Sequence, residues 1–139
     1  MGSRRQAREQ ALQLLYQLDV TRENATKTMQ GFWEAEPADA DVMQFARLLV
    51  NAVQSNQDRI DELITQASTN WKIHRMSYVD RNVLRLCVAE FLACDDVPPM
   101  VSMNEAIELG KRFGTTESGG FINGILDRIA RNLQLTGSK

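Results

Sequence analysis

The chain has 139 residues, a usual length for one domain, and a formal net charge of −2. Hydrophobic residues make up 43% and charged residues 24%, so a chain of this size can bury a core without a metal or a disulfide. The slightly acidic balance argues against simple electrostatic binding of nucleic acid, because such proteins usually carry a basic excess. We find neither a membrane-spanning apolar run nor a signal-peptide pattern, and we therefore expect a cytoplasmic protein without membrane contact.

The two cysteines, Cys87 and Cys94, are predicted to be free thiols. If they share one helix, their Cα atoms lie about 10 Å apart at a rise of about 1.5 Å per residue. A disulfide requires less than about 7 Å between these atoms. We expect both thiols to be buried, as in proteins of a reducing compartment.

Apolar residues in the N-terminal half recur with helical spacing, and no alternation typical of strands appears. A first helix is predicted over residues 4–19, and a short helix around Met29 and Trp33 is predicted to close at Glu36-Pro37. Asp39 or Asp41 can cap the next helix. Its apolar stripe runs over residues 42–67 and is interrupted at Asn56-Gln57, so one long helix and two helices with a bend both remain open.

The C-terminal half is predicted to contain three helices. Residues 77–80 form a variant capping box, and residues 83–92 are apolar on most sides, which indicates a central helix. After Pro98-Pro99, a capping box at Ser102–Glu105 predicts the start of the next helix, with Phe113 facing inward and Gly114 ending it. The last helix carries the stripe Ile122, Ile125, Leu126, Ile129 and Leu133, before a short tail at residues 136–139. We therefore expect an all-α, compact bundle of six or seven helices forming one domain over residues 1–139.

The sequence offers no sign of catalysis. A single histidine, His74, excludes a two-histidine metal motif, and no Cys/His set has the spacing of a zinc site. Gly119 and Gly124 have the spacing that begins a phosphate loop, but Ile125-Leu126 replaces the required Lys-Ser/Thr and no strand precedes them. We predict no catalytic residues, no metal ligands and no cofactor.

Two surfaces are not explained by the predicted fold. On the first helix, a second side away from the core stripe gathers Arg5, Arg8, Leu12 and Tyr16, with Arg4 close by. Arginines can bind phosphates and a tyrosine can stack or hold a partner. A solvated helix start, with Arg8 paired to a carboxylate, explains the pattern equally well. Phe121, on the shoulder of the last helix, can be a core residue or a stacking platform.

Several short segments, taken in order, resemble the NusB family of transcription antitermination factors. They span about residues 4–129, and each is weak alone whereas their combination is specific. The segments are Arg4-Arg5-Gln6-Ala7-Arg8-Glu9 with Leu15-Tyr16, Asp80-Arg81-Asn82-Val83-Leu84-Arg85, Val97-Pro98, Asn104-Glu105-Ala106-Ile107-Glu108-Leu109, Phe113-Gly114 and Phe121-Ile122-Asn123-Gly124-Ile125-Leu126-Asp127.

The resemblance implies two packed bundles of three to four helices and a function without catalysis. It implies binding of boxA-type single-stranded leader RNA together with NusE, a small-subunit ribosomal protein, in an antitermination complex on RNA polymerase that promotes ribosomal RNA transcription. A homodimer through the RNA-binding face is a further arrangement that the resemblance allows. The residues that match RNA-binding positions are Arg4, Arg5, Arg8, Glu117 and Phe121, and those that match positions at the NusE interface are Tyr16 and Asp80.

This chain also departs from the family pattern. Gln6 interrupts the arginine run, and Met100 and Gly120 stand where some members have lysine. These departures predict weak RNA binding without NusE. Two other hypotheses remain: a helical scaffold that binds only protein, and a stand-alone relative of the NusB-like domain of RNA methyltransferases.

Overall fold

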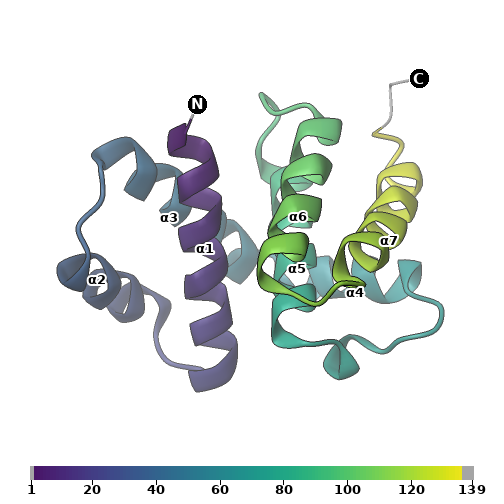
Figure 1. The fold of residues 1–139 in the computed structure, drawn as a ribbon, viewed down its shortest axis with the longest axis horizontal. Helices are drawn as coiled ribbons and strands as arrows, with labels where there is room; N and C mark the ends of the chain where they lie inside the picture. Colours follow the sequence, from purple (N-terminus) through teal and green to yellow (C-terminus); the bar gives the residue numbers. More distant parts are fainter. Residues whose placement is uncertain (1, 136–139) are drawn as a thin grey trace.

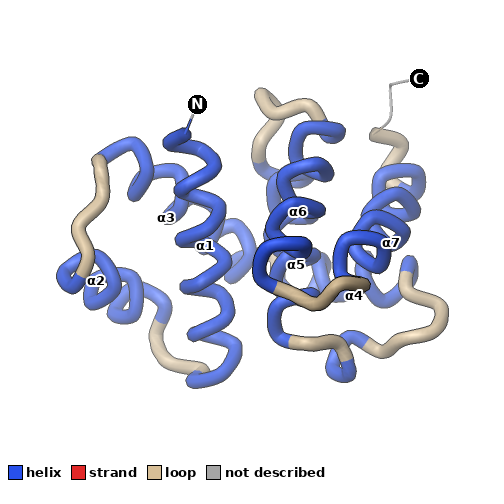
Figure 2. The backbone as a smooth tube through the Cα atoms, viewed as in Figure 1, coloured by secondary structure: helices blue, strands red, loops and turns tan. Residues whose placement is uncertain are grey.

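Residues 2–135 are described by a computed structural model, and within them every regular element is helical (Figure 2). The elements in chain order are α1 (Gly2–Thr21), α2 (Ala25–Ala35), α3 (Ala40–Ser55), α4 (Gln57–Ala67), the short 3-10 helix η1 (Ile73–Arg75), α5 (Tyr78–Ala93), α6 (Pro99–Phe113) and α7 (Ser118–Asn132). The predicted all-α fold is therefore confirmed, with seven α-helices in this range. The tail at residues 136–139 lies outside it.

Helix α5 is the centre of the structure. Its residues 82–90 are all buried, and it packs against α1, α3, α4, α6 and α7. Ser77 caps the start of this helix, and its Oγ accepts a hydrogen bond from the Asp80 backbone N–H at 3.0 Å. One half of the predicted capping box is thus confirmed, whereas the buried Oδ1 of Asp80 has no hydrogen-bond partner among residues 2–135. The predicted central helix is confirmed.

The helices form two groups, α1–α3 and α4–α7, with α1 standing between α3 and the α5–α6 pair (Figure 1). The predicted stripe of α1 supplies core residues: Ala7, Ala11 and Leu14 are fully buried. This arrangement has the two packed groups that the resemblance implies. It also places the first turns of α1 and α6 at the same end of the molecule.

The second side of α1 is not the open surface that the sequence suggested. Arg8 and Leu12 are buried, because α1 packs against both α3 and α5. Arg8 bonds Glu90 of α5 and also lies 5.5 Å from the centre of the Phe45 ring of α3. Arg5 and Tyr16, toward the two ends of the same side, stay exposed. A helix between two neighbours buries more than one stripe, so helical spacing alone did not distinguish its second buried side from a solvated one.

The stripe over residues 42–67 belongs to two helices. Asn56 separates α3 from α4: its φ of −123° leaves the helical region, and its side-chain amide donates to the Ala52 carbonyl at 2.9 Å. Asp39 occupies the N-cap position of α3 but makes no side-chain cap bond, and Asp41 accepts instead from the Val42 N–H at 3.0 Å.

The predicted start of α6 is wrong. The N-cap is Pro98, four residues before Ser102, and Pro99 occupies the first turn, a position where proline loses no helical hydrogen bond. Ser102 and Glu105 therefore lie inside the helix. Phe113, predicted to face inward, is 41% exposed, because the helix ends there. Gly114 ends α6 as predicted, and a Cβ on it would lie 2.3 Å from the Ser118 Oγ.

A buried ion pair joins α1 to α5. The Arg8 guanidinium donates from Nε to one Glu90 carboxylate oxygen at 2.7 Å and from Nη2 to the other at 2.9 Å. Their side chains are only 5% and 2% exposed. Ser102 of α6 donates its hydroxyl to Glu90 Oε1 at 2.8 Å, so three helices share one carboxylate. Bidentate, fully bonded geometry of this kind compensates the cost of burying the charges.

We predict that Glu90→Gln destabilises the protein by about 3–5 kcal/mol, because it leaves the Arg8 charge buried without an anionic partner. Urea unfolding followed by circular dichroism measures the change. The control Asp127→Asn breaks an exposed pair with Arg131 one helical turn away and should cost less than about 1 kcal/mol. Replacing both Arg8 and Glu90 by methionine should recover most of the loss, and equal losses for Glu90→Gln and the control would contradict this account.

Candidate functional site

Two exposed arginines stand at the open end of α1, each beside a carboxylate. The Arg4 side chain is 47% exposed, bonds Asp96 at 3.1 Å and lies 4.3 Å from the centre of the Phe45 ring. The Arg5 side chain is 60% exposed and donates two hydrogen bonds to Glu105, at 3.1 and 2.7 Å. The bond from Arg5 lowers the pKa of the Glu105 carboxyl, against the opposing effect of burial. Both guanidiniums are accessible to a phosphate that displaces a carboxylate.

Arg8 occupies a different environment from these two. Of the two interpretations that the sequence left open, pairing to a carboxylate is the one found, through Glu90. Arg8 also lies 4.0 Å from Glu105 Oε1, on the inner side of the Arg5–Glu105 pair. A ligand would have to open this buried pair to reach Arg8. Its role in RNA binding therefore stays a prediction from the resemblance alone.

Helix α6 continues the surface away from these arginines. It runs beside α1 in the same direction, and Arg112 near its end pairs with Glu9 of α1 (Figure 1). The Arg112 guanidinium lies 5.0 Å from the centre of the exposed Phe113 ring. The sequence analysis did not select Arg112 and Phe113 as binding residues. An aromatic next to an arginine at a helix end was the available signal.

Glu117 and Phe121 lie beyond the end of α6. They line a hollow of about 290 Å³ together with Trp71, Arg75 and Asp80. The α6 helix of 15 residues, about 22 Å long, separates this hollow from the open end of α1. The structure thus brings Glu117, Phe121 and Asp80 together. Arg4 pairs with Asp96, before the start of α6, and Arg5 pairs with Glu105, in the middle of α6.

Tyr16 pairs with an aromatic residue that the sequence analysis missed. The rings of Tyr16 and Tyr78 lie 5.4 Å apart, both more than 40% exposed, and the Arg81 guanidinium lies 4.6 Å from the centre of the Tyr78 ring. Tyr78 is in the first turn of α5, two residues before Asp80. The two predicted partner-binding residues are therefore linked through this turn of α5.

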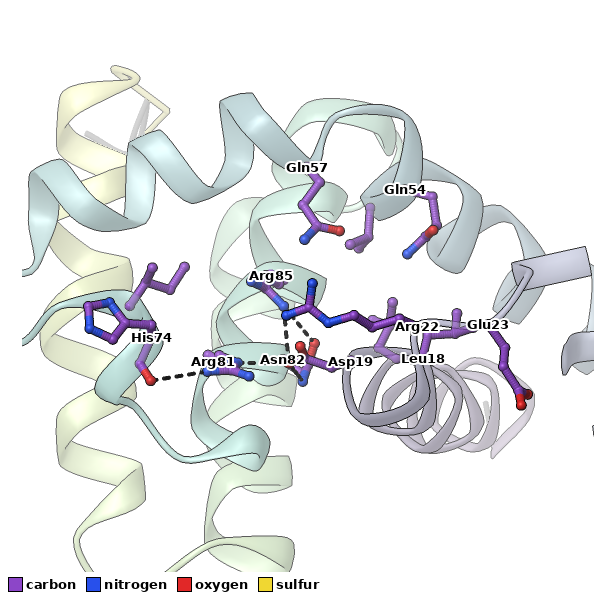
Figure 3. A pocket seen from close by; sticks show the side chains of 13 residues that line it. Leu18, Asp19, Arg22, Glu23, Gln54, Gln57, His74, Arg81, Asn82 and Arg85 are labelled. Carbon is purple, nitrogen blue, oxygen red and sulfur yellow. Dashed lines mark hydrogen bonds and ion pairs between the residues drawn. The ribbon is translucent and has the colours of Figure 1, made fainter.

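A polar pocket of about 350 Å³ lies at the end of α1, lined by Asp19, Arg81 and Arg85 among others (Figure 3). Asp19 accepts hydrogen bonds there from Arg81 Nε at 2.7 Å, Asn82 Nδ2 at 2.9 Å and Arg85 Nη1 at 3.2 Å. Arg85 also donates two bonds to Asp61 of α4, at 2.8 and 3.1 Å. Both arginines are therefore already neutralised by carboxylates, and their bonds join α1, α4 and α5. Asn82 also donates to the Tyr78 carbonyl at 2.8 Å.

The groups around Asp19 lower the pKa of its carboxyl. Burial by itself would raise the pKa of this carboxyl, but hydrogen bonds from Arg81 and Asn82 and the charges of Arg85 and Arg81 outweigh it, so the pKa is lowered. The folded state therefore favours the ionised carboxylate. The stabilisation is present above the ordinary pKa of aspartate, about 4, and is lost as the pH falls below it.

Cys87 and Cys94 are free and buried, as predicted, and burial raises the pKa of the Cys87 thiol well above its usual value. Among residues 2–135, no three His, Cys, Asp or Glu side chains come together in a way that would hold a metal ion. In the same range no helix has the length and apolar character needed to cross a bilayer.

The fold and these surfaces define an all-helical protein with two exposed, carboxylate-paired arginines at the start of α1 and an exposed aromatic pair, Tyr16 and Tyr78, near its end. The model of the NusB family matches residues 5–131. The transcription antitermination protein NusB of Myxococcus xanthus is 49% identical over 134 residues, covering 94% of this chain and 96% of the relative. The chain belongs to the NusB family of transcription antitermination proteins, which are not enzymes.

Solved structures support the same assignment. A structure of T. maritima NusB matches with a TM-score of 0.86 and 40% identity, over 92% of this chain and 90% of that one. A crystal structure of the antitermination factors NusB and NusE in complex with dsRNA matches with a TM-score of 0.84 and 30% identity, over 95% and 98%. The NusB chain there is thus a structural relative that was crystallised with a protein partner and RNA.

We predict that Asp19→Asn lowers the free energy of unfolding at pH 7 by about 2–4 kcal/mol, because Arg81 and Arg85 lose a charged acceptor. Since wild-type Asp19 must be protonated in acid, the two proteins should converge in stability as the pH falls below about 4. Urea unfolding between pH 7 and pH 3 measures the gap. Glu62→Gln, at an exposed position of α4, is the control and should follow the wild type. A gap that stays constant with pH would refute the assignment.

Proposed function

We propose that this chain acts in transcription antitermination by binding boxA-type single-stranded leader RNA together with NusE, within a complex on RNA polymerase that promotes ribosomal RNA transcription. The proposal includes a cytoplasmic location and one RNA-binding unit over residues 1–139. The observation that carries it is the pair of exposed guanidiniums of Arg4 and Arg5 on a NusB-family fold. The relative crystallised with NusE and RNA supports the choice of partners.

RNA binding begins with an exchange of partners at the open end of α1. A phosphate takes the place of Asp96 on Arg4 or of Glu105 on Arg5, and the fork of the guanidinium suits either anion. The exchange gains little net Coulomb energy, because one anion replaces another on the guanidinium. The net charge of −2 adds no general attraction for RNA. A basic partner supplies the missing positive charge, because the neutralisation of phosphates can be shared between two proteins.

From Arg5 the RNA strand follows α6 toward Phe121. The strand passes Arg112 and the exposed Phe113 ring and reaches the hollow of Glu117 and Phe121. Aromatic rings on such a path stack on unpaired bases, which a duplex keeps inside its helix. These rings support a single strand for this chain, although the RNA in the related complex is described as double-stranded.

The partner surface lies at the end of this path. Tyr16 and Tyr78 present two exposed rings, and Asp80 a half-buried carboxylate, to a basic protein, as NusE is proposed to be. Because Asp80 lines the same hollow as Phe121, NusE would lie next to the RNA. A homodimer through the RNA-binding face is the competing arrangement. It would cover Arg4 and Arg5, and sedimentation at increasing protein concentration distinguishes it from a monomer.

We predict that the double variant Arg4→Ala/Arg5→Ala weakens binding of labelled boxA-type RNA by about tenfold or more. The slope of log binding constant against log salt concentration should also become less negative. The expected change is about 0.7 for each phosphate of a single strand that the variant no longer neutralises. Fluorescence anisotropy with NusE present, against a scrambled RNA, measures both quantities. Arg59→Ala, at an exposed position of α4, is the matched control and should bind as the wild type does. Equal losses in the two variants, or no preference for boxA-type RNA by the wild type, would contradict the proposed function.

We predict that Asp80→Lys weakens NusE binding at least tenfold, because it reverses the charge beside Tyr78. The fold should be retained, since the Ser77 cap uses the backbone N–H of residue 80 and not its side chain. Isothermal titration calorimetry with NusE measures the effect, and RNA binding without NusE should not decrease. The same charge reversal at Glu62 is the control, and a similar loss there would undercut the assigned partner surface.

A further inference from the structure

Trp71 is more exposed than any other aromatic residue in the described range, with 53% of its surface accessible. It lies between the end of α4 and η1, in a segment whose backbone is fixed by a hydrogen bond from the Ser68 hydroxyl to the Trp71 carbonyl at 2.6 Å. One exposed aromatic side chain is ordinary on a protein surface. Trp71 differs from an ordinary exposed aromatic residue in the groups that surround it.

Two hollows lie beside Trp71, and Phe121 lines both of them. One, of about 290 Å³, contains Asp80 and Glu117, and the other, of about 220 Å³, is lined by Gly120 and Gly124 of α7 and by Thr69 and Asn70. Both are smaller than the usual pocket for a drug-sized ligand and are of a size for a single planar ring system. Trp71 and Phe121 come from separate elements, the segment after α4 and the first turn of α7.

The two glycines of α7 are not required by packing. A Cβ on Gly120 or on Gly124 would meet no atom within 4 Å, whereas a Cβ on Gly110 would lie 2.4 Å from the Ile122 side chain. Gly124 stands in the middle of α7, where glycine costs about 1 kcal/mol relative to alanine. The helix thus presents bare backbone to the 220 Å³ hollow at a cost in stability that no contact within residues 2–135 explains.

The groups around this hollow match the chemistry of a nucleotide. Two aromatic rings offer stacking surfaces, and Thr69 and Asn70 offer hydrogen-bonding side chains. Exposed cationic side chains stand at both hollows, Arg128 at the one of 220 Å³ and Arg75 at the other. Arginine beside an aromatic surface is typical of sites for single-stranded nucleic acid.

We propose that Trp71 is an RNA-binding residue, and that one unpaired base of the RNA stacks on it in the 220 Å³ hollow, against the bare backbone of α7 at Gly120 and Gly124. The inference rests on the proposed function and extends it to a particular base-binding subsite. Phe121 closes the hollow from the side of α7, and Asn70 lies at the edge of the base. The subsite continues the path that starts at Arg5 and follows α6.

The first test uses a substitution that should increase stability and, at the same time, weaken RNA binding. Gly124→Ala should raise the urea unfolding midpoint, since alanine favours a helix interior. It should weaken binding of boxA-type RNA by about tenfold, because its methyl group projects into the space proposed for the base. Gly31→Ala is the matched control, because Gly31 lies inside α2 and a Cβ there also meets nothing within 4 Å. It should raise stability equally and leave RNA binding unchanged.

A second pair of variants tests the stacking itself. Trp71→Ala should weaken RNA binding by about tenfold or more, whereas Trp71→Phe should keep most of it, as expected for stacking on an aromatic ring. RNA should also quench the tryptophan fluorescence of the wild type, and this quenching should disappear in Trp71→Phe. Each affinity is measured with NusE present, and NusE binding alone is measured by calorimetry.

The outcomes separate this inference from the proposed function. If the wild type binds boxA-type RNA selectively and Gly124→Ala and Trp71→Ala bind it equally well, the base subsite is overturned and the proposed function stands. If these variants lose affinity for NusE and not for RNA, the hollow is a protein-binding site and the inference is likewise overturned. If the wild type does not bind the RNA, the proposed function fails and the inference fails with it.

Discussion

The bidentate ion pair between Arg8 and Glu90 determines where α1 lies, and the surfaces of this protein depend on that placement. Two charges taken out of water are tolerated only in close, fully bonded geometry, so the pair permits one alignment of α1 against α5. Ser102 extends the constraint to α6. Because α1 has 20 residues and is about 30 Å long, fixing it near one end leaves the other end to be held separately. Asp19 does this through its bonds to Arg81, Asn82 and Arg85.

The accessible arginines are neutralised in the same way as the buried one. Arg4 and Arg5 are held by Asp96 and Glu105, so the open end of α1 is ordered before any ligand arrives. Ordered guanidiniums lose less conformational entropy on binding a phosphate, but the phosphate must replace a carboxylate that is already bound. This balance fits the proposal that a chain of net charge −2 binds RNA together with a basic partner.

Aromatic groups are concentrated at the opposite end, around the first turns of α5 and α7. Tyr16 and Tyr78 form one exposed pair, and Trp71 and Phe121 line the neighbouring hollows. The glycines of the C-terminal helices divide accordingly. Gly110 and Gly114 allow helices α6 and α7 to approach closely, whereas Gly124 faces open space. Glycine therefore serves close packing at Gly110 and Gly114, whereas at Gly124 it leaves backbone exposed.

Local pattern was sufficient to predict the class of fold and its central element. Helical spacing predicted six or seven helices and a buried α5, and Ser77 marked the start of that helix. The order of the short motifs indicated the family. These features depend on residues a few positions apart, which is the range over which helix caps and apolar stripes act.

Only the tertiary structure shows what a side chain bonds when its partner is distant in sequence. The Ser102–Glu105 pattern is a capping box by spacing, yet Ser102 bonds Glu90 and Glu105 bonds Arg5, 100 residues away. Likewise, the burial of Arg8 and the exposure of Phe113 depend on which helices cover them. No local pattern encodes that covering, because burial is a property of neighbours that the folded chain brings together.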